Sequence, residues 1–319
     1  MRTLCNLFLA VVLGGCAGSI DLQAHRGGRG LLPENTLPAF AHALKIGVTT
    51  LELDAAITRD GVVVISHDPV LNSVITRGPD GKWLTQNGPP IYSQTYADLL
   101  QYDIGRIDPA SKYAEQFPTQ RAIDGLRFAT LAELFALVAA SGDTRVRFSI
   151  ETKLSPFQRN ATVGPEEFVD ALLSVIDAHG MRDRVSLQSF DWRTLRIAQQ
   201  KAPTIPTVYL SAQQKFFDNI NAGDRQGSAR TAGLNACEFG DSVARMVNAA
   251  GGAAWSPYFR DIDQAKVREA QALGLHVIVW TVNETADIEH MLNWKVDGII
   301  SDYPDRVRTI LAVRNLRVR

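Results

Sequence analysis

Residues 49–68 read TTLELDAAITRDGVVVISHD, and this stretch decides the fold. Its two apolar runs, residues 49–57 and 62–65, are typical of β-strands. The Asp60-Gly61 pair between them is a strong signal for a β-hairpin. Because the connection is too short for a crossover helix, we expect the two strands to run antiparallel.

The first strand of this hairpin carries two carboxylates. Side chains alternate along a strand, so Glu52 and Asp54 share a face, with α-carbons about 6.6 Å apart. Two carboxylates at that span can bind one divalent cation. A Glu-x-Asp motif alone is more often part of a solvated face, but the flanking leucines here read as core, and buried carboxylates need a cation or a partner. With a two-residue turn, Asp54 would lie opposite His67.

Polar motifs also stand before and after the hairpin: HRGG at 25–28, PENT at 33–36, SHD at 66–68 and IETK at 150–153. Glu151 and Lys153 share one face of their predicted strand, because strand side chains alternate. A surface ion pair is the alternative explanation for these two residues.

The PENT motif introduces the first helix. Asn35 or Thr36 can cap it, residues 37–44 carry an apolar stripe at helical spacing, and Gly47 ends it. Glu34 lies directly before the cap. It could act in a site or hold the loop by accepting backbone N–H bonds, and we favour the structural role.

In order and spacing, these motifs resemble the hallmarks of the glycerophosphodiester phosphodiesterase family: His-Arg-Gly, Pro-Glu-Asn-Thr, Glu-x-Asp, and His-Asp after a short hairpin. The likeness continues at four later boxes, residues 150–153, 187–190, 279–283 and 298–304. It covers nearly the whole chain after residue 20. Any one box is a weak signal, but the set is specific.

The resemblance implies metal-dependent hydrolysis of glycerophosphodiesters to sn-glycerol 3-phosphate and an alcohol. The implied general acid and base are His25 and His67. The implied ligands of one divalent cation are Glu52, Asp54 and Glu151, and this all-oxygen set suits Ca²⁺ or Mg²⁺ better than zinc. The implied substrate-binding residues at the phosphate are Arg26 and Lys153. Phe190 and Trp280 could wall the pocket for the glycerol or alcohol part, although an aromatic residue at a strand end is more often core.

Two alternatives to this function stay open. The same site could serve a lysophospholipase D or an inositol-lipid phosphodiesterase. A lipid-anchored binding protein without turnover is the alternative from another class, and the complete set of polar groups argues against it.

The order of strands and helices predicts the fold class. Nine strand candidates occur, at residues 22–25, 49–57, 62–65, 146–151, 185–188, 207–210, 253–255, 276–280 and 297–301, mostly alternating with helical patterns. This pattern implies a parallel sheet. Because one strand pair is a hairpin, we expect an α/β fold, a distorted (β/α)8 TIM barrel with an insertion after the His67 strand. Sites in that fold lie at the carboxyl ends of the strands, and a strictly antiparallel hairpin would misplace His67.

The expected organisation is a single domain over residues 20–319, with the insertion at about 69–128. Residues 211–248 read as a long loop, either a lid or a surface excursion. Cys237 reads as buried packing. Net charge is −1 without a long basic run, so we expect no nucleic-acid partner.

The amino terminus resembles a lipoprotein signal. Arg2, an apolar run at residues 4–13 and Gly14-Gly15-Cys16 predict a signal peptide over 1–15 and a lipidated Cys16. Ordinary secretion is the alternative. Either way we expect an exported protein of the periplasm or cell envelope, as a lipoprotein on the outer membrane that meets the membrane only through its anchor. The oligomeric state is left open.

Overall fold

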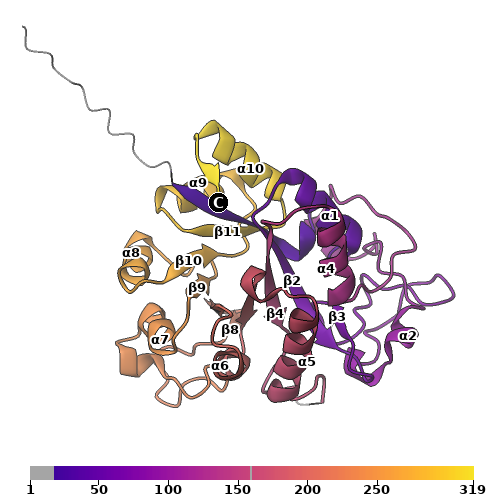
Figure 1. Cartoon of the computed structure of the whole chain (residues 1–319), viewed down its shortest axis with the longest axis horizontal. Coiled ribbons are helices and arrows are strands. Elements are labelled where there is room, and N and C mark those ends of the chain that lie inside the picture. Colours follow the sequence, from indigo (N-terminus) through magenta and orange to yellow (C-terminus); the bar gives the residue numbers. More distant parts are fainter. Residues whose placement is uncertain (1–17, 159) are drawn as a thin grey trace, which may run out of the picture.

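The computed structural model describes residues 18–158 and 160–319, and its centre is a closed barrel of eight parallel strands (Figure 1). The barrel strands are β1 (Ser19–Ala24), β2 (Thr50–Ile57), β4 (Arg147–Thr152), β5 (Val185–Ser189), β6 (Thr207–Ser211), β9 (Ala254–Pro257), β10 (His276–Val279) and β11 (Gly298–Ser301). They follow one another in chain order, and the pairing of β1 with β2 closes the ring. The predicted distorted (β/α)8 barrel is therefore confirmed.

Eight helices surround the barrel, one after each barrel strand or, for β2, after its hairpin partner (Figure 1). They are α1 (Leu37–Ile46), α4 (Leu131–Ala140), α5 (Pro165–Ala178), α6 (Trp192–Lys201), α7 (Val243–Ala249), α8 (Gln264–Ala272), α9 (Thr285–Asn293) and α10 (Pro304–Val313). Each presents apolar side chains to the outer face of the strands, and these join one hydrophobic core. Full burial of a leucine or phenylalanine side chain contributes about 1.5–3 kcal/mol, so this packing dominates the stability of the ring.

Helix α4 shows how the sequence sets an element. Thr130 and Glu133 form a capping box: the Thr130 hydroxyl accepts from the Glu133 N–H at 3.1 Å, and the Glu133 carboxylate accepts from the Thr130 N–H at 2.7 Å. The buried face repeats at helical spacing through Leu131, Leu134, Phe135 and Val138. The cap and the stripe together fix both the start of the helix and the side that packs.

Strand β3 (Val63–Ile65) runs antiparallel to β2, as expected, but the register differs from the prediction. Ala55 pairs with Ile65, so Asp54 faces Ser66 rather than His67. The reason is the turn. It holds three residues, 59–61, with Gly61 at φ +79° in the left-handed region, which is a common alternative to the two-residue Asp-Gly turn.

The hairpin still delivers His67 to the site. Strand β2 pairs with β4 only as far as Ala55 and continues to Ile57 beyond the barrel rim. Strand β3 then returns toward the barrel, and the Ser66 N–H donates to the carbonyl of Asp54 at 2.9 Å. His67 therefore arrives at the depth of Asp54, and the expectation that an antiparallel strand would misplace it is wrong.

The segment between β3 and α4 forms the insertion beside the barrel mouth. It contains η2 (Ile91–Ser93), α2 (Tyr96–Leu99) and α3 (Lys112–Gln116). A second hydrophobic cluster fills it, built on buried residues that include Leu71, Ile91, Leu99, Ile104 and Phe128. The outward side chains of the hairpin, Ala56 and Val64, belong to this cluster. The insertion is thus packed onto the hairpin.

Residues 211–248 are more ordered than a long loop. They contain a two-strand ribbon of β7 (Gln213–Gln214) and β8 (Phe217–Asp218), then η4 (Ala236–Phe239) and the start of α7. Helix α7 has only seven residues, so its buried positions do not repeat often enough to predict a helix. Cys237 is exposed, so its predicted burial is wrong.

The remaining elements are η1 (His25–Gly27), η3 (Arg182–Arg184) and β12 (Arg317–Val318). None of the described helices has the length and apolar character needed to cross a membrane. The predicted signal peptide 1–15 and Cys16 lie outside the described residues. These assignments and the domain limits of 20–319 and about 69–128 stay predictions.

Replacing Thr130 by Ala should lower the free energy of unfolding by about 1 kcal/mol, because the first turn of α4 loses its cap. Urea denaturation followed by circular dichroism measures the change. Thr309→Ala is the matched control, since exposed Thr309 lies inside α10 and alanine favours a helix interior. Equal stabilities of Thr130→Ala and the wild type would contradict the role of the cap.

Candidate active site

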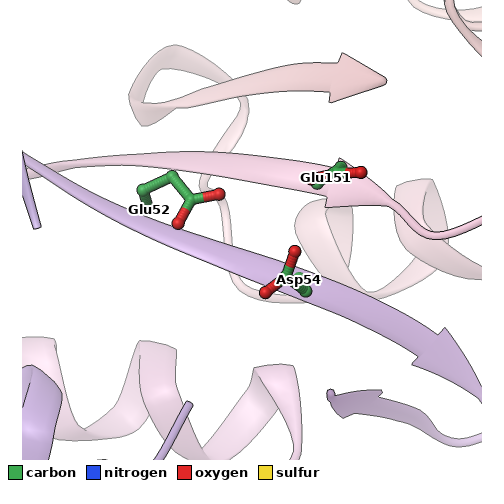
Figure 2. Close-up of side chains that lie close together, drawn as sticks. All are labelled: Glu52, Asp54 and Glu151. Carbon is green, nitrogen blue, oxygen red and sulfur yellow. The ribbon is translucent and has the colours of Figure 1, made fainter. Parts of the chain in front are cut away.

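Three carboxylates meet on two neighbouring strands, where Asp54 and Glu151 lie next to the last paired residues and Glu52 lies two residues deeper in β2. Glu52 and Asp54 project from β2, and Glu151 projects from β4 (Figure 2). Asp54 and Glu151 are direct partners in the parallel register, which explains their proximity. Each residue offers an oxygen within 4.8 Å of the others, and their exposed fractions are only 2%, 0% and 7%.

The three carboxylates repel one another when they are ionised. Burial and the neighbouring Asp54 raise the pKa of Glu52 well above its usual value. Burial also raises the pKa of Glu151 to about 7, although Lys153 counteracts the shift. Burial alone would raise the pKa of Asp54, but Lys153, His67 and Arg26 together hold it below its usual value. A divalent cation would relieve this conflict, because it favours the ionised form of all three groups.

The surroundings of the trio fit a cation. Asp54 Oδ1 is buried without a hydrogen-bond partner among the described residues, and so is Gln188 Oε1. The other oxygens are held in place: Glu52 accepts from the Arg26 N–H at 2.8 Å and from Gln188 Nε2 at 2.7 Å, and Asp54 Oδ2 accepts from Asn35 Nδ2 at 2.9 Å. Such outer contacts orient metal ligands. The trio can therefore hold Ca²⁺ or Mg²⁺, whose preferred ligands are oxygens.

His25 begins η1, directly after β1. Its Nδ1 lies 2.5 Å from Asp302 Oδ1, and Asp302 is fixed in turn by Arg29 Nε at 2.7 Å and by Asn283 Nδ2 at 2.7 Å. Burial lowers the pKa of His25, while Asp302 counteracts that shift. With Nδ1 directed at a carboxylate, Nε2 is left for a reacting group.

His67 has the same kind of support. Its Nδ1 lies 3.0 Å from Asp68 Oδ1, and Asn72 Nδ2 donates to the other oxygen of Asp68 at 2.6 Å. Burial, then Arg26 and Lys153, lower the pKa of His67 to about 4. Each histidine is thus oriented by its own aspartate.

Two cations lie beside the carboxylates. Lys153 Nζ donates to Glu151 at 2.8 Å and lies 3.6 Å from Asp54 Oδ1. Arg26, 7% exposed and at φ +51°, has its NH1 2.8 Å from Glu34 Oε1 and its Nε 3.3 Å from Asp54 Oδ2. Glu34 therefore holds a side chain rather than the backbone contacts predicted for it.

A cavity of about 110 Å³ joins these groups. Seven of the nine predicted site residues line it: His25, Arg26, Glu52, His67, Glu151, Phe190 and Trp280. Asp54 and Lys153 adjoin it through the carboxylate trio. The rings of Phe190 and Trp280 meet edge to face, 5.1 Å between centroids, and form the apolar wall. The structure thus gathers every residue that the sequence proposed.

Sequence reasoning gave no role to several residues that support this site. Arg29 and Tyr113 lie outside the motifs. Asp302 belongs to the 298–304 box and directly follows β11, where barrel sites form, and this is the signal that could have found it. Tyr113, in the insertion, donates its hydroxyl to Glu34. Asn35 was considered as a helix cap, yet the cap position is Thr36 and the Asn35 amide binds Asp54.

Cleavage of a phosphodiester concentrates negative charge on phosphoryl oxygens and needs one proton removed and another supplied. A small cavity with fixed cationic side chains, a carboxylate trio and two oriented imidazoles meets those needs. Fold and site together define the class of protein as a TIM-barrel phosphodiesterase.

Comparison with known proteins identifies the family of this chain. The sequence matches the profile of the glycerophosphoryl diester phosphodiesterase family over residues 25–306, and the chain belongs to that family. A glycerophosphodiester phosphodiesterase of Bacillus subtilis (strain 168) is 28% identical over 287 residues, 88% of this chain and 83% of the relative. The crystal structure of a protein from Silicibacter pomeroyi DSS-3 shows 36% identity and a TM-score of 0.84, covering 94% of this chain and 95% of that one.

A phosphodiesterase from Oleispira antarctica, solved in complex with the product sn-glycerol-3-phosphate, shares the fold with a TM-score of 0.67 at 24% identity, over 91% of this chain and 96% of that one. The predictions of fold class and of a phosphoric diester hydrolase acting on glycerophosphodiesters are confirmed. The alternative of a non-catalytic binding protein is set aside.

Replacing Glu52 by Gln or Asp54 by Asn should weaken binding of Ca²⁺ or Mg²⁺, because each change removes a charged ligand. Turnover should fall at least about a hundredfold. Titration calorimetry on chelator-treated protein measures affinity apart from activity. Glu238→Gln, at an exposed position, is the matched control. Wild-type cation affinity in both site variants would refute the metal assignment.

Replacing Asp302 by Asn should lower the pKa of His25, because Asp302 raises it. The loss of a fixed imidazole should also reduce kcat by about 10²-fold or more, as expected when a histidine loses its orienting carboxylate. NMR titration of the histidine and steady-state kinetics are the two readouts. An unchanged pKa of His25 with wild-type kcat would remove Asp302 from the site.

Proposed function

We propose that this enzyme hydrolyses glycerophosphodiesters, with a divalent cation bound, to sn-glycerol 3-phosphate and an alcohol. One observation carries the proposal: two imidazoles, each fixed by an aspartate, face one small cavity whose wall includes Glu52 and Glu151 of the carboxylate trio. The complex of the Oleispira antarctica phosphodiesterase with sn-glycerol-3-phosphate supports the choice of product.

Each of these protein side chains has its own role in the reaction. One histidine takes the proton from the attacking hydroxyl through Nε2, and the other protonates the leaving alcohol; the negative phosphodiester favours the protonated form of that second ring. The side chains of Arg26 and Lys153 stabilise charge on the phosphoryl oxygens. A bound cation would supply further charge stabilisation at those oxygens. The resemblance implies attack by the glycerol 2-hydroxyl and a cyclic phosphate that water opens, which ³¹P NMR of the reaction can detect.

The size of the cavity favours deacylated substrates. About 110 Å³ suits a glycerol or a small head group, not an acyl chain lying beside it. A human lysophospholipase D is nevertheless 25% identical over 306 residues, 92% of this chain and 85% of the relative, so a lysophospholipid belongs in the test.

The test is an assay of sn-glycerol 3-phosphate release from glycerophosphocholine and glycerophosphoethanolamine, with choline release from lysophosphatidylcholine alongside, each with and without chelator. We expect cleavage of the two glycerophosphodiesters that chelator abolishes, and His25→Ala and His67→Ala should each cost about 10²–10⁴ in rate. His42→Ala is a control, since His42 lies outside the site. Activity undiminished by chelator would refute the role of the cation, and a preference for lysophosphatidylcholine would favour the alternative.

We also propose that Cys16 carries a lipid and that the protein is an outer-membrane lipoprotein. Strand β1 begins at Ser19, at the amino end of the barrel strands, opposite the site. A groove of about 690 Å³ opens on that face, lined by Arg145, Arg147, Arg308, Arg317 and Arg319 and, among the described residues, one carboxylate, Asp143. Anionic lipid head groups attract such a surface. This charge supports an orientation in which the amino ends of the barrel strands face the membrane and the site faces away from it.

The anchored protein and a form starting at Ala17 should cleave glycerophosphocholine equally well, because the site faces away from the bilayer. Phospholipid in vesicles should be cleaved far more slowly by both. Cys16→Ser should move the protein from the membrane fraction to the soluble fraction. Faster cleavage of vesicle phospholipid by the anchored form would contradict the orientation.

A further inference from the structure

A second cavity adjoins the catalytic one. Its volume is about 160 Å³, and it shares two wall residues with the catalytic cavity, Glu151 and Phe190. Its other walls come from the chain after β4, including Lys153 and Ser155, and from the 211–248 segment, where Phe217 and Arg230 face it. Arg26 lines the first cavity and Lys153 the second, so the two proposed phosphate-binding groups lie on either side of the boundary.

Arg230 is held rigidly at this second cavity. Its guanidinium carbon lies 5.1 Å from the ring centroid of Phe217 and 5.3 Å from that of Phe157, and its NH2 donates to Ser155 Oγ at 3.0 Å. Phe217 in turn packs edge to face on Phe190, 5.0 Å between centroids. Stacking on two rings pre-orders the planar group, so little side-chain entropy is left to lose on binding.

Arg230 has no ion-pair partner among the described residues. Over residues 18–158 and 160–319, no carboxylate lies within 4.0 Å of it, although the side chain is half-buried. Burial lowers the pKa of Arg230, and the nearby carboxylates of Asp191 and Glu151 counteract that shift. Both carboxylates already have cationic partners: Asp191 accepts from the side chain of Arg193 at 2.8 and 2.5 Å, and Glu151 accepts from Lys153 at 2.8 Å. A half-buried cation without a counter-ion is costly, and an anionic ligand would remove that cost.

The two cavities can be assigned by their walls. The catalytic cavity holds both histidines and suits one half of the diester, the glycerol. The second cavity has no histidine, lies across Glu151 from the first, and is built from connecting segments. A diester whose phosphate sits at the boundary would place its other half, the leaving alcohol, against Arg230.

We propose that the second cavity binds the head-group alcohol of the diester and that Arg230 selects head groups bearing an anionic group, such as the carboxylate of serine. This inference rests on the proposed function and adds the substrate class. The fork of N–H donors matches two carboxylate oxygens. A quaternary ammonium such as choline would instead meet Lys153 and Arg230, and the ring face of Phe217 is already taken by the guanidinium.

The experiment compares kcat/KM for glycerophosphoserine and glycerophosphocholine in the wild type and in Arg230→Gln. We expect the wild type to favour the serine diester by about tenfold or more, the scale of one charged hydrogen-bond pair. Arg230→Gln should abolish that preference, and Arg230→Lys should keep only part of it, because an ammonium lacks the fork. Arg225→Gln, an exposed arginine of the same segment, is the matched control and should keep the wild-type ratio.

The outcomes separate the two proposals. Turnover of both diesters by the wild type with no preference, or a ratio unchanged in Arg230→Gln, overturns the role of Arg230 and leaves the proposed function intact. Turnover of neither diester overturns the proposed function and the inference with it. If Arg230→Gln fails to fold, judged by circular dichroism, the wild-type ratio and the Arg230→Lys ratio decide.

Discussion

The site depends on three carboxylates that share one buried corner of the barrel. Ionised side by side in a low dielectric, they would repel one another by several kcal/mol. Hydrogen-bond donors and one positive charge from separate segments contact these carboxylates: the backbone N–H of Arg26, the amides of Asn35 and Gln188, and the ammonium of Lys153. These groups fix the oxygens and offset only part of their charge, and Asp54 Oδ1 keeps no hydrogen-bond partner among the described residues, so the trio remains available for a cation.

That constraint shapes the neighbouring histidines. Arg26 and Lys153, which balance the trio, also lower the pKa of His67, while a separate set of groups around Asp302 holds His25. The two imidazoles thus face one cavity but are hydrogen-bonded to different carboxylates. Such a division suits a reaction in which one ring accepts a proton while the other donates one.

Much of the fold could be predicted because local patterns and global structure agree. Apolar runs located the barrel strands to within about three residues, and the Thr130 capping box fixed the start of α4. The hairpin register failed because an Asp-Gly pair permits turns of two or three residues, and nothing local decides between them. Helix α7 was missed because its seven residues make only about two turns, too few for a periodic pattern to stand out.

The site residues, too, could be predicted where the sequence signal was local and not where it was long-range. Residues on strands next to motifs were predicted, since alternation places Glu52 with Asp54 and Glu151 with Lys153. Contacts between residues far apart in the sequence could not be predicted. His25 and Asp302 are 277 residues apart, and Arg230 reaches its cavity from a segment without a motif. Only closure of the barrel brings β1 and β11 together, and that is a property of the whole chain.

The hairpin belongs to two packing units at once. Ala55 and Ile65 pack into the barrel core, whereas Ala56 and Val64 pack into the insertion. Protein segments open locally in cooperative units of this size. Opening of the insertion would release His67 while β2 and β4 keep the carboxylate trio intact. The molecule would then pass through a state that retains the carboxylate trio but is catalytically silent, and hydrogen exchange should find the insertion opening before the barrel does.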